Sequence, residues 1–285
     1  MERNDNVFDR DGKNDLHWTA MMHHDGKFYM YYNYGMAVTG PAPFMTGLAV
    51  SDDGVNFRNV KDVILYPGTS WDRILIEMHS IIRDGNRWRM YYCGFDGNWR
   101  IGMAESDDLL NWWKFPEPIL KLGDNRWEDM HVADPHVIFF RGKYMMYYMG
   151  KGEVWQVGLA TSKDGEEWYK HFENPIIKAS EKWCDGCVAL SGVVEYKGML
   201  LAAIHGYDKS EEKFRVKLFK SAKGIKWLPA DVPAIEPGEW CNRGVVHPEI
   251  IIVDNKLHVY YTGIRKGETN EHRIGRVVYD KNILL

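Results

Sequence analysis

Asp25-Gly26-Lys27-Phe28-Tyr29-Met30-Tyr31-Tyr32 is a tight turn followed by an apolar, aromatic strand, and the chain repeats this pattern five times. The repeated turn residues are Gly26, Gly85, Gly142, Gly198 and Asn255, at intervals of 59, 57, 56 and 57 residues. Asp-Gly and related pairs between apolar runs are the strongest short-range signal for a β-hairpin. A nearly constant interval between hairpins predicts an architecture built from one repeated unit.

A second strand and turn follow each hairpin. In the first repeat Gly47–Ser51 leads into Asp53-Gly54, and in the third Gly158–Ser162 leads into Asp164-Gly165 and then Trp168. Five repeats of four strands each predict an all-β five-bladed β-propeller with four antiparallel strands per blade. We expect residues 1–285 to form this single domain, with the N-terminal segment near Val7 and Phe8 completing the last blade. No stretch keeps a helical period, so we expect few helices.

Charge and composition exclude several classes of partner. The 285 residues carry a net charge of −4, with 45% hydrophobic and 27% charged residues, which is the profile of a globular protein without an electrostatic reason to bind nucleic acid or an anionic membrane. No apolar run approaches the roughly 18 residues that a membrane span needs. Met1–Asp5 lacks the apolar core of a signal peptide. We therefore expect a cytoplasmic protein, or a secreted one whose signal peptide has been removed.

The cysteines offer one metal-like or redox-like spacing. Cys184 and Cys187 are separated by two residues, whereas Cys93 and Cys241 stand alone. A second pair of this spacing is absent from the sequence, and the surroundings do not alternate between strands and helices. We therefore expect reduced, structural thiols rather than a zinc or redox site.

Acids and histidines gather where the first strand of each repeat begins. In a propeller this strand lines the central channel, so these positions lie at one mouth. The three richest starts are Glu77-Met78-His79, Asp134-Pro135-His136 and His247-Pro248-Glu249. By spacing, Glu77, Asp134, Leu190 and His247 take equivalent positions, and His79, His136, Gly192 and Glu249 follow two residues later on the same strand face. The first repeat offers Asn14-Asp15-Leu16-His17-Trp18 near the comparable place.

Two interpretations of this gathering are open. Polar side chains in a channel can simply tie the blades together, because buried polar groups need hydrogen-bond partners. Acids and histidines that converge in a concavity also form the pattern of a ligand-binding or catalytic site. We favour the second interpretation for the set as a whole.

Several segments resemble those of the five-bladed propeller glycoside hydrolases, the arabinanase, levansucrase and invertase group with families 43, 32, 68, 117 and 130-like members. The segments are Trp71-Asp72, Ile101–Ser106 and Gly158–Gly165, and the resemblance covers essentially the whole chain. It implies a glycosidase of carbohydrate or polysaccharide metabolism that uses an Asp in the first blade, an orienting Asp in the middle and a Glu as acid. Asp15 and Asp134 match the first two, whereas Leu190 stands where the acid Glu is expected.

The resemblance therefore implies a set of carboxylates with different roles. Glycoside hydrolysis needs one carboxyl group to protonate the leaving oxygen and another to activate water or attack carbon. We assign Asp15 as base or nucleophile and Asp134 as the group that orients substrate and tunes a neighbouring pKa. Glu77 or Glu249 is then the acid, with Asp185 in the preceding loop as an alternative.

The remaining candidates bind rather than react. His79, His136 and His247 can hydrogen-bond to sugar hydroxyls, and with Glu77 and Asp134 they have the chemistry to hold an axial divalent metal. We expect no cofactor, and keep the metal as an alternative. Aromatic rings at the mouth can stack on sugars, and arginines there can bind a carboxylated sugar or phosphate. These residues are Trp18, Trp99, Trp155, Arg100, Arg243 and Arg265.

Three functions follow from this set. The first is a glycoside hydrolase that cleaves a small sugar or oligosaccharide at the channel mouth with paired carboxylates. A second is a carbohydrate-binding propeller without catalysis, which the missing acid at Leu190 favours. The third is a glycoside phosphorylase of the family 130 kind, although we identify none of that family's own motifs in the sequence. A small carbohydrate is the expected partner in all three.

Overall fold

The computed structural model describes residues 1–10, 12, 16–35, 44–68, 70–267 and 271–280, with all of their side chains except those of Met78 and His79. Within these ranges the protein is all-β, and its one helical segment is a short 3₁₀ turn, η1 (Lys182–Cys184). No helix of the described residues is long and apolar enough to cross a membrane. The expectation of an all-β fold with few helices is therefore confirmed.

The strands pair in groups of four, which we number as units in chain order. The first unit contains β2 (Leu16–His24), β3 (Lys27–Tyr34), β4 (Met45–Ser51) and β5 (Arg58–Leu65). The second contains β6 (Leu75–Asp84), β7 (Arg87–Phe95), β8 (Trp99–Ser106) and β9 (Trp113–Lys114). Both form separate antiparallel sheets, with the strands in sequence order.

The other strands repeat the same pairing inside one larger sheet. The third unit contains β10 (His131–Phe140), β11 (Lys143–Lys151), β12 (Trp155–Ser162) and β13 (Tyr169–Lys170), and the fourth contains β14 (Cys187–Tyr196), β15 (Met199–Asp208), β16 (Lys213–Ser221) and β17 (Leu228–Pro229). The fifth contains β18 (Gly244–Val253), β19 (Lys256–Arg265), β20 (Glu271–Asp280) and β1 (Glu2–Phe8). Single parallel pairs, Trp155 with Cys187 and Phe214 with Gly244, join these units.

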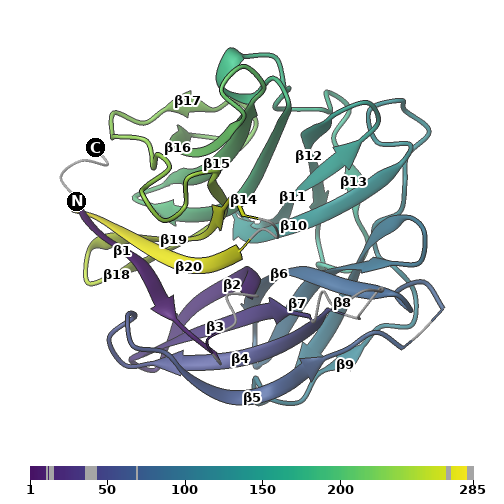
Figure 1. Ribbon diagram of the computed structural model, residues 1–285. Coiled ribbons are helices and arrows are strands. Elements are labelled where there is room, and N and C mark those ends of the chain that lie inside the picture. The colour runs from purple at the N-terminus through teal and green to yellow at the C-terminus, as the bar shows by residue number, and fades with distance from the viewer. Residues whose placement is uncertain (11, 13–15, 36–43, 69, 268–270, 281–285) are drawn as a thin grey trace.

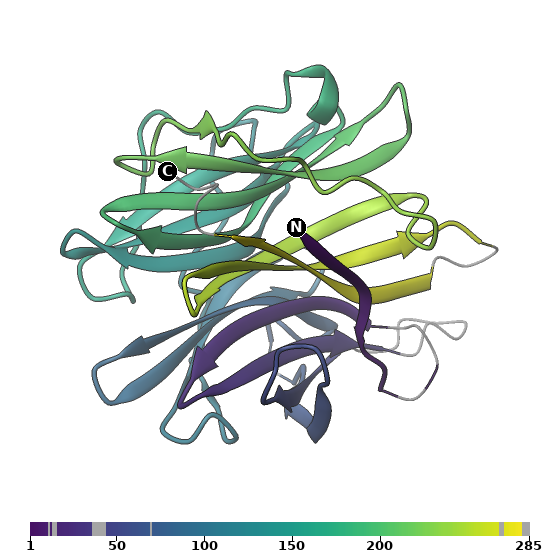
Figure 2. The same cartoon turned by 90° about the vertical axis from the view of Figure 1, so that its left-hand side faces the viewer.

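The N-terminal strand completes the last unit, as expected from the sequence. β1 pairs antiparallel with β20, and Figure 1 shows the purple β1 lying against the yellow β20. Figure 2 shows the same strand running from the yellow strands down to the purple ones. Val7 and Phe8 at its end are buried, and they pack with the core of the first unit. The segment therefore ties the end of the chain to its beginning.

The first strands of the five units contact one another in a closed cycle. β2 packs against β6, β6 against β10, β10 against β14, β14 against β18, and β18 against β2. These strands enclose a channel, and we call the end at which they begin its mouth and the end at which they reach their hairpins its turn end. The first residues of these strands therefore lie at the mouth.

An aromatic contact joins each unit to the one before it at four of the five junctions. The aromatic residue after the third strand meets a buried tyrosine of the preceding unit, with ring centroids 5.6–6.1 Å apart; the pairs are Phe57–Tyr260, Trp112–Tyr31, Trp168–Tyr91 and Trp227–Tyr147. Each tyrosine hydroxyl also donates a hydrogen bond to a turn carbonyl of the next unit. These aromatic residues therefore help to pack each unit against the one before it.

Candidate active site

The first strand of every unit carries an irregularity close to its start. The regular pairing is interrupted between Leu16 and Thr19, Glu77 and His79, Ala133 and His136, Leu190 and Gly192, and Val246 and Glu249. Bulges of this kind redirect a side chain and are common next to active sites. The five bulges lie at one level of the channel, just inside the mouth.

The hairpin register defines which bulge residues are equivalent. His24 pairs with Lys27, Phe140 with Lys143, Tyr196 with Met199 and Val253 with Lys256, and in the second unit Asp84 pairs with Arg87. Counted back from these pairs, the equivalent positions are Trp18, Met78, Asp134, Leu190 and His247. The sequence spacing placed Glu77 in this set, and that placement is wrong by one residue, because Gly85 is the first residue of its turn whereas Gly142 is the second. Glu77 stands one position nearer the mouth.

Three members of this set meet across the channel. The rings of Trp18 and His247 have centroids 3.9 Å apart, and His247 Nδ1 lies 3.2 Å from Asp134 Oδ2. Ser191 Oγ donates a hydrogen bond of 3.2 Å to the same carboxylate oxygen. Asp134 is 5% exposed, and its backbone N–H donates to the Cys93 sulfur. Trp18, His247 and Asp134 thus form one connected group, in which the Asp134 carboxylate also accepts from Ser191.

Glu77 joins this group through Trp18. The indole Nε1–H of Trp18 donates a 2.8 Å hydrogen bond to Glu77 Oε2. The pKa of Glu77 is raised to about 7, chiefly by burial; the Trp18 hydrogen bond opposes this shift, and the nearby charge of Asp134 adds to it. Glu77 therefore gains or loses its proton near neutral pH, and it does so while hydrogen-bonded to Trp18 at the mouth.

The three tryptophans expected to bind sugar lie together. Trp18, Trp99 and Trp155 pack around two buried residues, Cys93 of β7 and Ala133 of β10. The Trp155 ring stacks on His131 at 5.7 Å with an interplanar angle of 20°, and the Trp99 backbone N–H donates to His131 Nδ1. Aromatic surface therefore lies next to Glu77 and Asp134, which is the kind of surface on which a sugar ring can stack.

His136 and Glu249 lie one level deeper in the channel. They are 8% and 5% exposed, and His136 Nδ1 is 3.6 Å from Glu249 Oε1. Gly192, which has no side chain, lets the fifth unit approach, because a Cβ there would lie 2.7 Å from the Pro248 carbonyl. Both side chains line a cavity of about 400 Å³ among the turn-end halves of the five first strands. The structure thus pairs Glu249 with His136 two residues further along their strands than His247 and Asp134.

This deeper pair is electrostatically linked to the mouth, because the charge of Asp134 also helps to raise the pKa of Glu249. Burial lowers the pKa of His136, but the Glu249 carboxylate and the backbone of Val193 outweigh that effect, so the pKa is raised. Burial raises the pKa of Glu249 to about 7 against the opposing influence of His136. The arrangement is that of a coupled buried pair, which ties the third unit to the fifth across the channel.

Further histidines border the mouth on the side of the fifth and first units. His17 and His272 have ring centroids 4.6 Å apart, and His205 lies 4.6 Å from His247, whose backbone N–H donates to His205 Nδ1. Burial and the neighbouring imidazoles lower the pKa of His17 to about 3 and that of His272 to about 4, so both are neutral at pH 7. We did not single out His205 and His272 in the sequence, because they lie on the second and third strands of their units.

The other candidates are placed as follows. Arg243 borders a cavity of about 340 Å³ with Asn242 and Lys266, and its charge helps to lower the pKa of His272. Arg100 pairs with Asp96, and Arg265 lies 3.9 Å from Glu271. Asp15 and the His79 side chain lie outside the described residues, so their predicted roles stay predictions.

No cofactor site stands out within the part of the chain that the structure describes. Those residues contain no group of three or more His, Cys, Asp or Glu side chains placed to hold a metal ion. The thiols of Cys93, Cys184, Cys187 and Cys241 are free, and burial raises the pKa of Cys187 to about 12. A thiol with so high a pKa stays protonated at neutral pH, which fits a structural role.

A comparison with protein families gives a match over most of the chain. The family model for beta-1,4-mannooligosaccharide phosphorylase, glycoside hydrolase family 130, matches residues 21–219. The sequence therefore carries the pattern of this family over residues 21–219, although no single motif of it stands out. A 1,2-beta-oligomannan phosphorylase of Thermoanaerobacter is 23% identical over 269 residues, which are 86% of this chain and 85% of that protein. An uncharacterized protein of Mycobacterium tuberculosis is 23% identical over 198 residues, and the match spans 65% of each chain.

Solved structures show the same fold. A structure described as a glycoside hydrolase superimposes with a TM-score of 0.83 at 17% identity, over 96% of this chain and 90% of that one. A second structure superimposes with a TM-score of 0.71 at 19% identity, over 94% of this chain and 85% of that one. Its description says that the GH130 family of mannoside phosphorylases contains glycoside hydrolases that target beta-1,2 mannosidic linkages in Candida mannan. At these identities the likeness establishes the fold, and the family rests on the sequence match.

Proposed function

The chain belongs to glycoside hydrolase family 130, and we propose that it cleaves β-mannosidic bonds of oligosaccharides at the channel mouth, with inorganic phosphate as the second substrate. The observation that carries the proposal is the Glu77–Trp18–His247–Asp134 group, in which two interacting carboxyl groups lie beside aromatic surface. We interpret the five four-stranded units as the blades of a five-bladed propeller, which would place this group on its axis.

The chemistry assigns a role to the carboxyl pair. In phosphorolysis a phosphate oxygen forms a bond to the anomeric carbon, the bond to the leaving oxygen breaks, and the leaving oxygen receives a proton. Phosphate is itself the nucleophile, so the enzyme has to supply an acid but no base. Glu77, whose pKa is raised to about 7, provides the proton near neutral pH. Asp134 helps to raise that pKa and orients the substrate.

Other groups at the mouth suit the two substrates. Trp18, Trp99 and Trp155 offer ring faces for the apolar side of a mannose unit. Arg243, with His17 and His272 on the same side of the mouth, offers positive charge and N–H donors for phosphate. Bound phosphate would raise the pKa of these imidazoles and favour their protonated forms, because an opposite charge stabilises the charged state.

The relatives support phosphorolysis over hydrolysis. One is named as a phosphorylase of 1,2-beta-oligomannan and another as a beta-1,2-mannobiose phosphorylase, both from Thermoanaerobacter. The hydrolase expected from the sequence remains the second candidate, since the family also includes hydrolases and Asp15 would be the group that activates water. The two reactions share the acid and differ in the nucleophile.

Product analysis tests the proposal directly. The enzyme is incubated with β-1,2- and β-1,4-linked mannooligosaccharides, with and without inorganic phosphate, and the products are separated. Phosphate-dependent release of mannose 1-phosphate is the expected result. Phosphate-independent release of mannose would establish hydrolysis instead, and binding without any turnover would establish the carbohydrate-binding function.

A further inference from the structure

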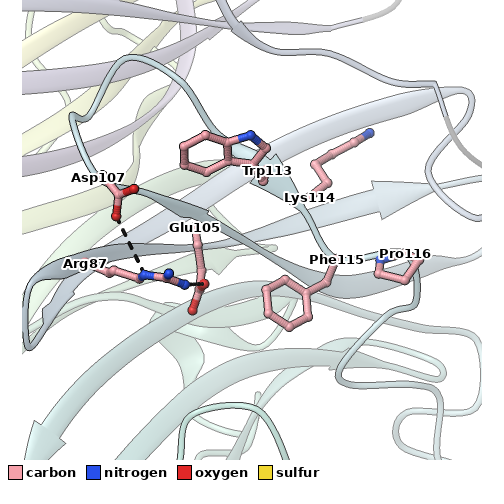
Figure 3. A pocket seen from close by; sticks show the side chains of 7 residues that line it. All are labelled: Arg87, Glu105, Asp107, Trp113, Lys114, Phe115 and Pro116. Carbon is pink, nitrogen blue, oxygen red and sulfur yellow. Dashed lines mark hydrogen bonds and ion pairs between the residues drawn. The ribbon is translucent and has the colours of Figure 1, made fainter.

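A groove far from the channel mouth lies along the outer edge of the second unit. It has a volume of about 520 Å³ and runs beside β9, lined by Arg87, Glu105, Asp107, Trp113, Lys114, Phe115 and Pro116. Figure 3 shows Arg87 reaching toward Asp107 and Glu105, with Trp113 and Phe115 beside them. The volume is within the range of small-molecule sites, roughly 300–1,000 Å³.

An exposed tryptophan forms one wall of this groove. Trp112 packs into the core against Tyr31, and strand alternation turns the next residue, Trp113, outward. Trp113 is 60% exposed, which leaves a large indole surface in water. Exposure of one apolar side chain is ordinary, so it is the groove bordered by this indole that indicates a binding surface.

The charges in the groove neutralise one another. Arg87 lies 2.9 Å from Glu105 and 3.6 Å from Asp107, and Lys114 pairs at 2.7 Å with the buried Asp72. Each cation therefore already has an acidic partner, so the groove has no excess charge to attract a phosphate or a nucleic acid. It presents hydrogen-bond donors and acceptors next to an aromatic face.

The repeated units provide an internal comparison. Trp113 pairs across the strands with Glu105, and the equivalent pairs are Tyr169 with Thr161 in the third unit and Leu228 with Lys220 in the fourth. Arg87 is matched by Lys143 and Met199 at the equivalent hairpin positions. Tyr169 and Leu228 are as exposed as Trp113, at 61% and 65%. The scaffold therefore explains an exposed residue here, but the combination of an indole with an arginine and two acids belongs to the second unit.

We propose that this groove is a second carbohydrate-binding site, which holds a neutral oligosaccharide against Trp113. A sugar ring has one face of C–H groups that suits an indole and a rim of hydroxyls that suits Arg87, Glu105 and Asp107. A neighbouring groove of about 540 Å³ shares Phe115 and Pro116 and continues toward Trp168 of the third unit, so a chain longer than one sugar has room to extend. The choice of mannooligosaccharides as probe rests on the proposed function.

Binding is measured on a chain that does not turn over its substrate. Isothermal titration of the Asp134→Asn variant with β-mannooligosaccharides is expected to show a second, weaker site. Adding Trp113→Ala should weaken that site by about tenfold or more, the scale of a lost aromatic stacking partner with its buried area. The matched control is Tyr169→Ala, which removes an equally exposed aromatic residue from the equivalent position and should leave both sites unchanged.

Activity separates this site from the channel mouth. Trp113→Ala should leave turnover of a short β-mannoside unchanged and raise KM only for longer chains. The inference would be overturned if Trp113→Ala changed neither the turnover of substrates of any chain length nor the binding of mannooligosaccharides. The proposed function would then still stand. Trp113-dependent binding of mannooligosaccharide without any turnover would support the inference and count against the proposed function.

Discussion

Asp134 and His247 occupy the same position in the third and fifth units, and they meet across the channel with His247 Nδ1 3.2 Å from Asp134 Oδ2. Both residues have positive φ angles, 54° and 47°, and both precede a proline. Non-glycine residues in this conformation cost about 1–3 kcal/mol, and such residues cluster at functional sites. Two bulges of the same kind thus bring an acid and an imidazole from non-adjacent units to one point.

Replacing Asp134 by Asn should remove activity. The amide keeps the shape of the side chain but loses the charge that raises the pKa of Glu77 and faces His247. We expect kcat to fall by about a hundredfold or more, the scale of a lost acid–base group. Steady-state kinetics measure this, with thermal unfolding as the check on the fold. A folded variant with activity close to wild type would remove Asp134 from the mechanism.

The acid role of Glu77 predicts a particular pH profile. Because its pKa is raised to about 7, Glu77 is protonated below that value and loses its proton as the pH rises. Wild-type kcat/KM should therefore decline on the basic side with an apparent pKa near 7. Glu77→Gln should be slower by about a hundredfold or more, and the basic decline should disappear. A slow variant that keeps the decline would assign the titration to another group.

Trp18→Phe tests the hydrogen bond that holds Glu77. The variant keeps an aromatic ring against His247 and loses the Nε1–H that donates to Glu77 Oε2. That hydrogen bond stabilises the charged carboxylate, so its loss should raise the pKa of Glu77 further. The basic limb of the pH–rate profile should move to higher pH. A limb that stays in place, or one that moves to lower pH, would contradict this account of the site.

The buried His136–Glu249 pair predicts how stability depends on pH. The folded-state pKa of Glu249 is raised from 4.5 to about 7, and that of His136 is also raised. Groups whose pKa is higher in the folded state stabilise the fold at low pH, and this contribution is lost as the pH rises through the folded value. Unfolding by urea should show stability falling between pH 4.5 and about 7, and Glu249→Gln should reduce that fall. An equal fall in both proteins would exclude Glu249 as its source.

The tyrosine contacts between units can be tested for stability. Tyr147 is fully buried, and its hydroxyl donates to the Gly224 carbonyl of the next unit. Tyr147→Phe leaves that buried carbonyl unpaired, which should cost about 1–3 kcal/mol in the free energy of unfolding. Tyr169→Phe, which alters a 61% exposed tyrosine, is the control and should cost much less. Equal losses in the two variants would show that the hydroxyl bond is not what joins the units.

Local signals in the sequence determined the repeat. The hairpin turns, the alternating strands and the aromatic residue after each third strand depend on neighbours within a few positions, and each is visible as a pattern of residue types. The closure by the segment near Val7 and Phe8 was also expected from the sequence, and β1 supplies the fourth strand of the fifth unit. From the same repeat, the first strands could be expected to line one channel and Trp18, Trp99 and Trp155 to gather at its mouth.

Spacing alone could not give the register of the bulges or the contacts across the channel. A bulge adds one residue to a strand, and Gly85 is the first turn residue where Gly142 is the second, so counting from the turns placed Glu77 one residue out of register. Spacing also could not show that His136 meets Glu249 in one buried pair, because the two residues belong to strands of non-adjacent units. The sequence by itself determined which residues line the channel. Only the tertiary structure decided which of them meet, because non-adjacent units are brought together by closure of the ring and not by any interval along the chain.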